Sequence, residues 1–421
     1  MNIEELFAGI GVVIDDKVFT SDEQGDRIVR IVKELESIRK FPLVKYAELP
    51  DDDVLAKLTN VSFLLLDWEI EPKQEELGEE APNVRLGDVL KTENERRVIE
   101  IVNKTLKNSL VPVFIFSNQN IGSINQKLTE AGVDLTKSQI FIKSKAELTE
   151  EDALFQKIGE WVDGVSGVYV AKAWENAFNK AKNQFFTELA NNTSHWPKAL
   201  FKAAADDSTD PGEEITQAIS QNVISRMQPI EVSQEQIDKD KDIPSKEEVL
   251  GIMKGQFFLD KASDASMVGD FFKKKSGEFY MNIRPTCDCV EGREKSDGLI
   301  YLLRCSRLSD TQVARLYLPG DGHFNETIVC AIIGPLYENK FYRIDFGKVD
   351  VVESAQWKEK KVGRILPPVI NHITERYGLY VQRQALPRIP KDIIPELVLE
   401  NKDKEQNPGC LAALLKPVKK K

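Results

Sequence analysis

The chain has 421 residues, 30% of them charged, and a formal net charge of −11 at pH 7. This chain is longer than a typical domain with a single hydrophobic core, so we predict two or three domains. The negative charge argues against a general nucleic-acid binder but leaves a local basic patch open. No apolar run approaches the roughly 18 residues that span a bilayer, and the start carries no basic signal-peptide pattern, so we expect a cytoplasmic protein without a membrane partner.

The first 163 residues alternate strand-like and helix-like segments. Apolar strands are predicted at residues 12–14, 43–46, 61–67, 111–116 and 139–142, and helices around 21–39, 50–58, 98–106, 121–128 and 149–162. Continuous apolar strands that alternate with amphipathic helices are typical of a parallel sheet covered on both faces. We therefore predict an α/β domain with a doubly wound, five-stranded parallel sheet.

Polar side chains follow four of these strands. Asp67 ends the central apolar run, and Asp15 and Asp16 follow the first strand. Ser117 follows the fourth strand and Lys143 the fifth. Because ligands of open α/β sheets bind at the carboxyl ends of the strands, these side chains are expected to form one site.

In this order of residues, the segment from about 8 to 163 resembles the receiver domain of two-component response regulators, the CheY-like family. The resemblance implies the strand order 2-1-3-4-5. It also implies that Asp67 accepts a phosphoryl group from a histidine-kinase-type partner. Ser117 would donate a hydrogen bond to the phosphoryl group, and Lys143 would pair with it.

The same resemblance implies a Mg²⁺ site. Asp15, Asp16 and Asp67 would supply carboxylate ligands, and the backbone carbonyl of Glu69 a further one. Mg²⁺ prefers oxygen ligands and keeps some waters, which suits carboxylates at a strand edge.

Three features depart from the usual receiver pattern. Lys143 is followed by Ser144, where the family usually has a proline. The position three residues before Lys143 is Ile140 instead of an aromatic, and Phe141 is expected to point to the other face of the strand. An acidic, loop-like insertion at residues 71–80 follows the proposed phosphoacceptor. The usual aromatic route of signalling is therefore not expected.

The rest of the chain divides into further predicted parts. A helical connector at 164–227 contains helices at 168–190 and 211–226, and a charged linker occupies 228–247. A C-terminal α+β domain is predicted at 248–410, before a basic tail at 411–421. In this domain we expect an antiparallel sheet or small barrel with strands at 278–283, 299–305, 314–318, 327–333 and 341–352, followed by a helix at 367–377.

The C-terminal part contains three groups of residues that resemble sites, and the sequence favours none of them. Soft ligands occur at Cys287, Cys289, Cys305 and His323, but their spacing is poor for zinc, and unevenly spaced cysteines are typical of reduced thiols. A carboxylate group of the kind found in nucleases occurs at Asp345, Asp350 and Glu353 with Lys358, a spacing that arises by chance in a highly charged chain. A basic face for an acidic or nucleic-acid partner is offered by Arg284, Arg304, Arg307 and Arg343, for which simple solvation is the favoured explanation.

The leading hypothesis is a response-regulator-like signalling protein in which phosphorylation of Asp67, with Mg²⁺, controls a C-terminal output domain. It is not expected to be an enzyme beyond auto-dephosphorylation. One alternative is a pseudo-receiver used as an assembly scaffold without phosphorylation. Another is a C-terminal hydrolase or nuclease regulated by the receiver. A homodimer and an output partner of unknown identity are left open.

Overall fold

The computed structural model contains two compact units, Met1–Pro244 and Ser245–Lys421. It describes residues 3–20, 27–58, 60–70, 84–135, 139–148, 153–206, 211–239, 241, 243–289, 298–320, 322–384 and 390. The expected acidic loop at 71–80 and basic tail at 411–421 lie outside these residues. Each unit has hydrophobic clusters of its own.

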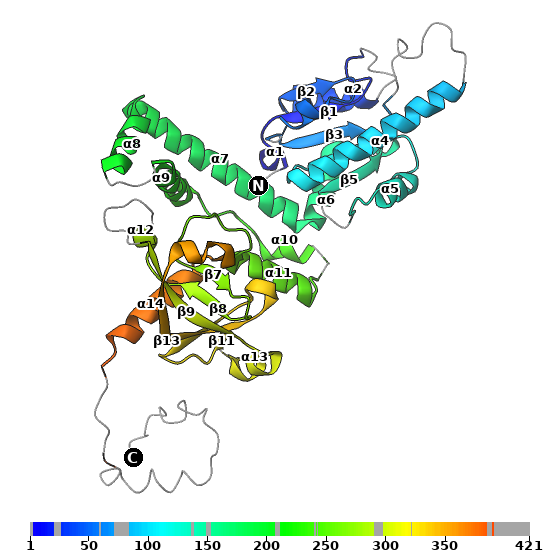
Figure 1. The fold of residues 1–421 in the computed structure, drawn as a ribbon. Coiled ribbons are helices and arrows are strands. Elements are labelled where there is room, and N and C mark those ends of the chain that lie inside the picture. The colour runs from blue at the N-terminus through cyan, green and yellow to red at the C-terminus, as the bar shows by residue number, and fades with distance from the viewer. Residues whose placement is uncertain are drawn as a thin grey trace, which may run out of the picture. The chain divides into compact units, whose positions relative to one another are not determined.

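Five parallel strands form the sheet of the first unit, in the order β2-β1-β3-β4-β5 (Figure 1). Their bounds are Gly11–Ile14 (β1), Leu43–Tyr46 (β2), Phe63–Asp67 (β3), Val113–Ser117 (β4) and Ile140–Ser144 (β5). Every residue of β3 and β4 is buried, as expected for central strands covered on both faces. The predicted doubly wound sheet and its strand order are confirmed.

Helices cover both faces of this sheet. Their bounds are Ile3–Leu6 (α1), Arg27–Lys33 (α2), Asp52–Leu55 (α3), Val84–Asn108 (α4), Ile121–Glu130 (α5) and Ala153–Gly164 (α6). Alternate strand residues such as Val13, Leu65 and Phe114 pack against α1, α2 and α6. Their neighbours Val12 and Leu64 pack against α4 and α5 on the other face. Because successive side chains of a strand point to opposite faces, the same strands contribute to a hydrophobic core on each face of the sheet.

A group of helices follows the sheet within the first unit. Their bounds are Ser166–Asn192 (α7), Trp196–Asp206 (α8), Pro211–Arg226 (α9) and Gln234–Lys239 (α10). The predicted helices at 168–190 and 211–226 are confirmed as α7 and α9, whose side chains form a small cluster around Phe185 and Val223. The sequence did not predict α8. Among the described residues, no helix is long and apolar enough to cross a membrane.

The main sheet of the second unit is antiparallel, with the order β12-β13-β9-β8-β7-β14-β6. Its strands span Phe258–Leu259 (β6), Asp270–Lys273 (β7), Phe279–Asn282 (β8), Leu299–Arg307 (β9), Cys330–Ile333 (β12), Tyr342–Glu353 (β13) and Lys361–Ile365 (β14). Tyr317–Leu318 (β10) and His323–Phe324 (β11) pair separately. The helices are Lys246–Phe257 (α11), Thr286–Cys289 (α12), Asp310–Leu316 (α13) and Val369–Gln382 (α14). The predicted antiparallel α+β layout is confirmed.

The prediction of a strand at residues 314–318 is wrong. Residues 310–316 form α13, because Ser309 and Gln312 make a reciprocal capping box that starts a helix there. Only Tyr317 and Leu318 remain extended, as β10. The helix α11 begins with the same kind of capping box: Ser245 accepts a hydrogen bond from the Glu248 N–H, and the Glu248 carboxylate accepts one from the Ser245 N–H.

Candidate functional site at the carboxyl edge of the parallel sheet

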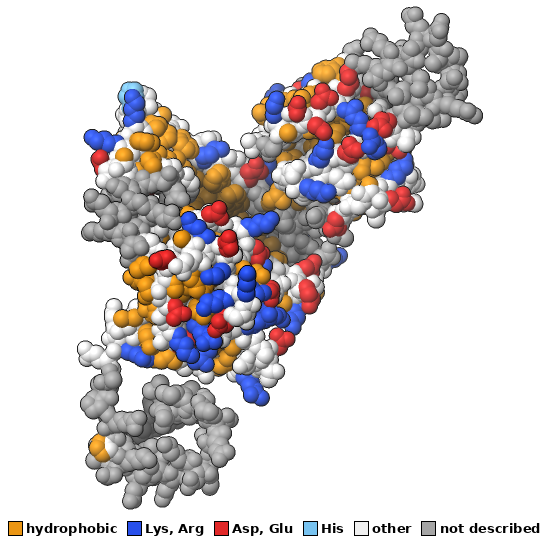
Figure 2. All heavy atoms as spheres, in the orientation of Figure 1, with side chains coloured by type: hydrophobic (Ala, Val, Ile, Leu, Met, Phe, Trp, Pro, Cys, Tyr) orange, Lys and Arg blue, Asp and Glu red, His pale blue; other side chains and the backbone are white. Residues whose placement is uncertain are grey.

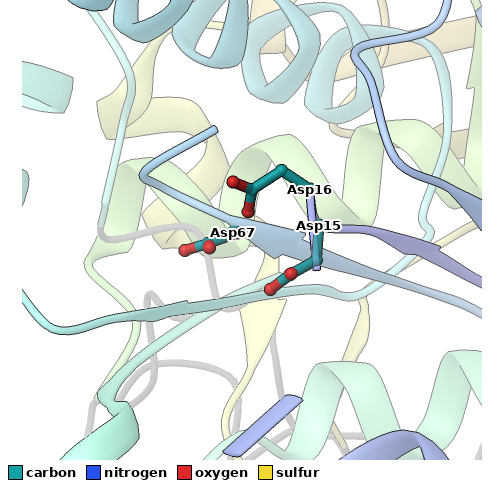
Figure 3. A group of neighbouring side chains, drawn as sticks. All are labelled: Asp15, Asp16 and Asp67. Atoms are coloured by element: carbon teal, nitrogen blue, oxygen red, sulfur yellow. The ribbon is translucent and has the colours of Figure 1, made fainter. Parts of the chain in front are cut away.

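Three aspartates lie together where β1 and β3 end (Figure 3). Ile14 of β1 is paired with Leu66 of β3, so the residues that follow, Asp15 and Asp67, lie side by side. One carboxylate oxygen from each of Asp15, Asp16 and Asp67 lies within 4.8 Å of the others. This is the point at which chain connections leave β1 and β3 in opposite directions, and open α/β sheets bind ligands there.

The donors of this triad suit a hard cation. Asp15 and Asp67 are buried and Asp16 is half-buried. The backbone holds two of the carboxylates in place: the Lys17 N–H donates to Asp15 Oδ1 at 2.9 Å and the Glu69 N–H to Asp67 Oδ1 at 3.2 Å. A site with three carboxylates and no nitrogen or sulfur ligand fits cations of the Mg²⁺ or Ca²⁺ type. The acidic triad can therefore hold a metal ion.

The lysine at this site is Lys145. Its Nζ lies 2.8 Å from Asp67 Oδ2 and 3.0 Å from Asp15 Oδ2, and its side chain is only 6% exposed. A buried ammonium group that contacts two buried carboxylates compensates part of their mutual repulsion. Lys145 therefore neutralises much of the charge of the acidic pair.

The prediction of Lys143 for this position is wrong. The Lys143 side chain is one-third exposed, and its Nζ lies 3.6 Å from a carboxylate oxygen of Glu147. The strand β5 continues to Ser144, two residues beyond the predicted end at Ile142. A short helical turn, Lys145–Glu147 (η2), then begins, and the Ser144 hydroxyl accepts a hydrogen bond from the Ala146 N–H at 3.1 Å. The reversal of the chain after Ser144 places Lys145 at the carboxyl edge.

With Lys145 as the lysine of the site, the sequence around it still departs from the receiver pattern. Ala146 follows the lysine, so proline is absent there too. The residue three positions earlier is now Ile142, again aliphatic, and it packs on the α4 and α5 side of the sheet. Phe141 lies in the core on the opposite side, as predicted. The aromatic side chain expected of a usual receiver is absent at this position.

Ser117 is fully buried at the end of β4, on the same edge of the sheet. Its Oγ accepts a hydrogen bond from the Gln119 N–H at 2.9 Å. The Gln119 side chain in turn donates to Glu69 Oε1 at 3.1 Å, which joins the loops after β3 and β4. Ser117 is thus fixed beside the acidic edge. The predicted role of the Glu69 carbonyl as a ligand stays a prediction.

The electrostatics of the site depend on burial. Burial, together with the negative charge of Asp15, raises the pKa of Asp67 to about 7, although Lys145 and the Glu69 N–H oppose this rise. Burial by itself lowers the pKa of Lys145, but the charges of Asp67 and Asp15 outweigh it and hold that pKa above its usual value. Lys145 is therefore charged near neutral pH, whereas Asp67 is close to its titration point.

The constellations that the sequence did not favour as sites are not assembled into metal centres among the described residues. Cys289 and Cys305 belong to hydrophobic clusters on different faces of the antiparallel sheet, and the Cys287 side chain lies outside the description. Asp345, Asp350 and Glu353 are spread along β13, and the described residues contain no metal-binding group other than the aspartate triad. Arg284 is buried and donates to the Leu299 carbonyl, so it cannot contribute to a basic face.

Comparisons with known proteins add no relative. No family model matches the chain, and a search of curated proteins finds no similar sequence. The chemistry of the site is therefore inferred from its own geometry.

Proposed function

We propose that the first unit is a receiver domain of the two-component type, in which Asp67 accepts a phosphoryl group from a histidine-kinase-type phosphodonor. The observation that supports this most directly is the joint placement of Asp15, Asp16, Asp67 and Lys145 at one sheet edge. The strand order 2-1-3-4-5 and the buried Ser117 beside this edge are consistent with it. A cytoplasmic setting belongs to the same proposal.

The proposed reaction forms one bond and breaks one. A carboxylate oxygen of Asp67 attacks the phosphorus atom of the donor, and the bond from phosphorus to the donor atom breaks with its electron pair leaving on the donor. Asp15, Asp16 and Asp67 would hold Mg²⁺, which when bound would neutralise charge on the phosphoryl oxygens. Asp67 must lose its proton before it attacks, which its pKa of about 7 permits at neutral pH.

Lys145 and Ser117 have positioning roles in this proposal. The Lys145 ammonium group is a point charge already within hydrogen-bond distance of the attacking carboxylate, so a short rotation of its flexible stem reaches a phosphoryl oxygen. The Ser117 hydroxyl accepts one hydrogen bond from the backbone and keeps its own proton available to donate. Both groups act by orientation and electrostatics.

The test uses a small phosphodonor. Full-length protein is incubated with acetyl phosphate and Mg²⁺, and intact mass is measured. We expect the mass to increase by one phosphoryl group in the wild type and in Asp52→Asn, a control that changes an exposed aspartate of the same unit. Asp67→Asn should show no gain. A wild-type protein that is not modified and does not bind Mg²⁺ would refute the proposal.

A pseudo-receiver scaffold is the second candidate, and two observations favour it. The single ammonium group of Lys145 satisfies both Asp15 and Asp67, so the metal-free site already contains a paired network. Ile142 and Ala146 also lack the features of the usual phosphorylation response. In this case, complexes with a partner protein would form equally well with wild type and Asp67→Asn, and acetyl phosphate would not change their affinity.

The proposed route from the site to an output passes through α7. The Asn176 amide on this helix donates to the carbonyls of Glu5 and Leu6 at 2.8 and 3.0 Å, and Tyr169 and Ala173 lie in the core beside α6. A rearrangement of the receiver core would thus reach α7 directly. Hydrogen exchange of residues 166–192 should change on phosphorylation, and unchanged exchange would exclude this route.

A further inference from the structure

A pocket of about 650 Å³ on the second unit is lined by eight residues, four of which are lysines. Two turns build it. The first joins β7 to β8 and carries Lys274 and Lys275, directly after Lys273 at the end of β7. The second lies between β13 and β14 and carries Glu359 and Lys360. Four ammonium groups and one carboxylate therefore surround this pocket, in a protein whose overall charge is strongly negative.

A buried tryptophan holds the two turns together. Trp357 packs edge-on against Phe272 of β7 and Tyr280 of β8, with ring centroids 5.6 and 5.2 Å apart. The indole is 5% exposed, so this contact is part of the core on that side of the sheet. Aromatic pairs in this geometry stabilise beyond their buried area. The pocket is therefore preformed.

The same aromatic groups position two of the lysines. Lys274 Nζ lies 4.6 Å from the Tyr280 ring centroid and 5.2 Å from that of Trp357, and Lys360 Nζ lies 4.5 Å from the Trp357 centroid. In the described part of the chain, neither ammonium group pairs with a carboxylate, whereas Lys273 pairs with Glu338 at 3.0 Å. The ammonium groups of Lys274 and Lys360 thus contact only neutral oxygen atoms and aromatic rings and leave their positive charge available to a ligand.

We propose that this pocket binds a compact polyphosphorylated anion, such as a nucleoside triphosphate or tripolyphosphate. Lysine ammonium groups are strongly hydrated point charges that bind phosphate, and a multivalent anion relieves their mutual repulsion. The volume lies within the range of small-ligand sites. The indole of Trp357 is too buried to stack on a base, so recognition is through the phosphates.

The surroundings of the pocket favour a compact anion over a nucleic acid or a membrane surface. Glu359 lines the pocket, and Glu278, Glu338 and Glu353 bond to residues of the two turns or to residues that line it. These carboxylates would repel an extended polyanion. On the face shown in Figure 2, the Lys and Arg side chains of this unit are interspersed with Asp and Glu instead of forming a continuous band.

The test is a titration of full-length protein with tripolyphosphate by calorimetry at about 0.15 M salt. The double variant Lys275→Glu/Lys360→Glu should bind at least about tenfold more weakly than the wild type. Lys348→Glu reverses the charge of a lysine outside the pocket that is 61% exposed, and it should stay within about twofold of the wild type. ATP should compete with tripolyphosphate for the same site.

Four results would overturn the proposal. The first is a wild-type protein that does not bind tripolyphosphate, and the second is an equal loss in the Lys348→Glu control. The third is a short DNA duplex that binds more tightly than tripolyphosphate. The fourth is binding to anionic lipid vesicles without binding to the free anion.

Discussion

Lys143 and Lys145 are two residues apart, yet their surroundings differ completely. Lys145 is buried against Asp15 and Asp67, whereas Lys143 is partly exposed near Glu147. Lys145→Ala leaves two buried carboxylates without their counter-charge, so we expect the free energy of unfolding to fall by about 3–5 kcal/mol in metal-free buffer. Lys143→Ala should change it by less than about 0.5 kcal/mol. Urea denaturation of both variants measures the difference, and equal effects would contradict the assignment of Lys145.

The raised pKa of Asp67 predicts a pH-dependent metal affinity. Burial and the charge of Asp15 hold this pKa at about 7, so a proton must leave before a cation binds. Calorimetry with Mg²⁺ should show affinity rising about tenfold per pH unit below pH 7 and levelling off above it. Affinity that does not vary with pH across this range would mean that Asp67 is already ionised or is not a ligand.

The raised pKa of Asp67 makes the metal-free fold less stable as the pH rises, whereas it makes metal affinity increase with pH. Because the pKa of Asp67 is higher in the folded protein than its ordinary value of 3.8, the native state binds more protons between these values. The contribution of Asp67 to stability is present below about pH 4 and is lost as the pH rises through about 7. Comparing thermal unfolding of wild type and Asp67→Asn across this range isolates the contribution, and a difference that does not depend on pH would contradict it.

At the scale of single elements, the turn after β5 determines which lysine enters the site. The Ser144 hydroxyl accepts a hydrogen bond from the Ala146 N–H and so starts the turn that carries Lys145. Ser144→Ala should lower the free energy of unfolding by about 1 kcal/mol and slow phosphorylation by acetyl phosphate. Ser123→Ala changes an exposed serine on α5 and is the matched control. Equal rates in the two variants would show that this cap does not position Lys145.

The sequence predicted elements well where long periodic patterns exist. Apolar runs located all five parallel strands and the helices α7 and α9. The polar ends of the strands located four residues of the sheet edge, Asp15, Asp16, Asp67 and Ser117. The sequence could not identify the lysine of the site. The predicted fifth strand ended at Ile142, whereas β5 ends at Ser144, and an apolar pattern does not fix the end of a strand to within two residues. The strands β6, β7 and β14 were missed because they are short and gain their stability from pairing with neighbours distant in sequence.

At the scale of the whole molecule, the two units have separate cores. No described hydrophobic cluster contains residues from both sides of the division at Pro244 and Ser245. A fragment of residues 1–244 should therefore fold alone, bind Mg²⁺ with the affinity of the full chain, and retain phosphorylation of Asp67. Circular dichroism and calorimetry of the fragment measure this. A fragment that is unfolded would show that the first unit depends on the second for its stability.

The central claim is that Asp67 carries the phosphoryl group, and identification of the modified residue tests it most directly. Protein treated with acetyl phosphate and Mg²⁺ is reduced with borohydride, which converts an aspartyl phosphate into homoserine, and the peptides are sequenced by mass spectrometry. We predict homoserine in place of Asp67 and at no other aspartate, with no conversion when Mg²⁺ is omitted. Conversion at a different aspartate, or none at Asp67 in protein that binds Mg²⁺, would contradict the proposed function.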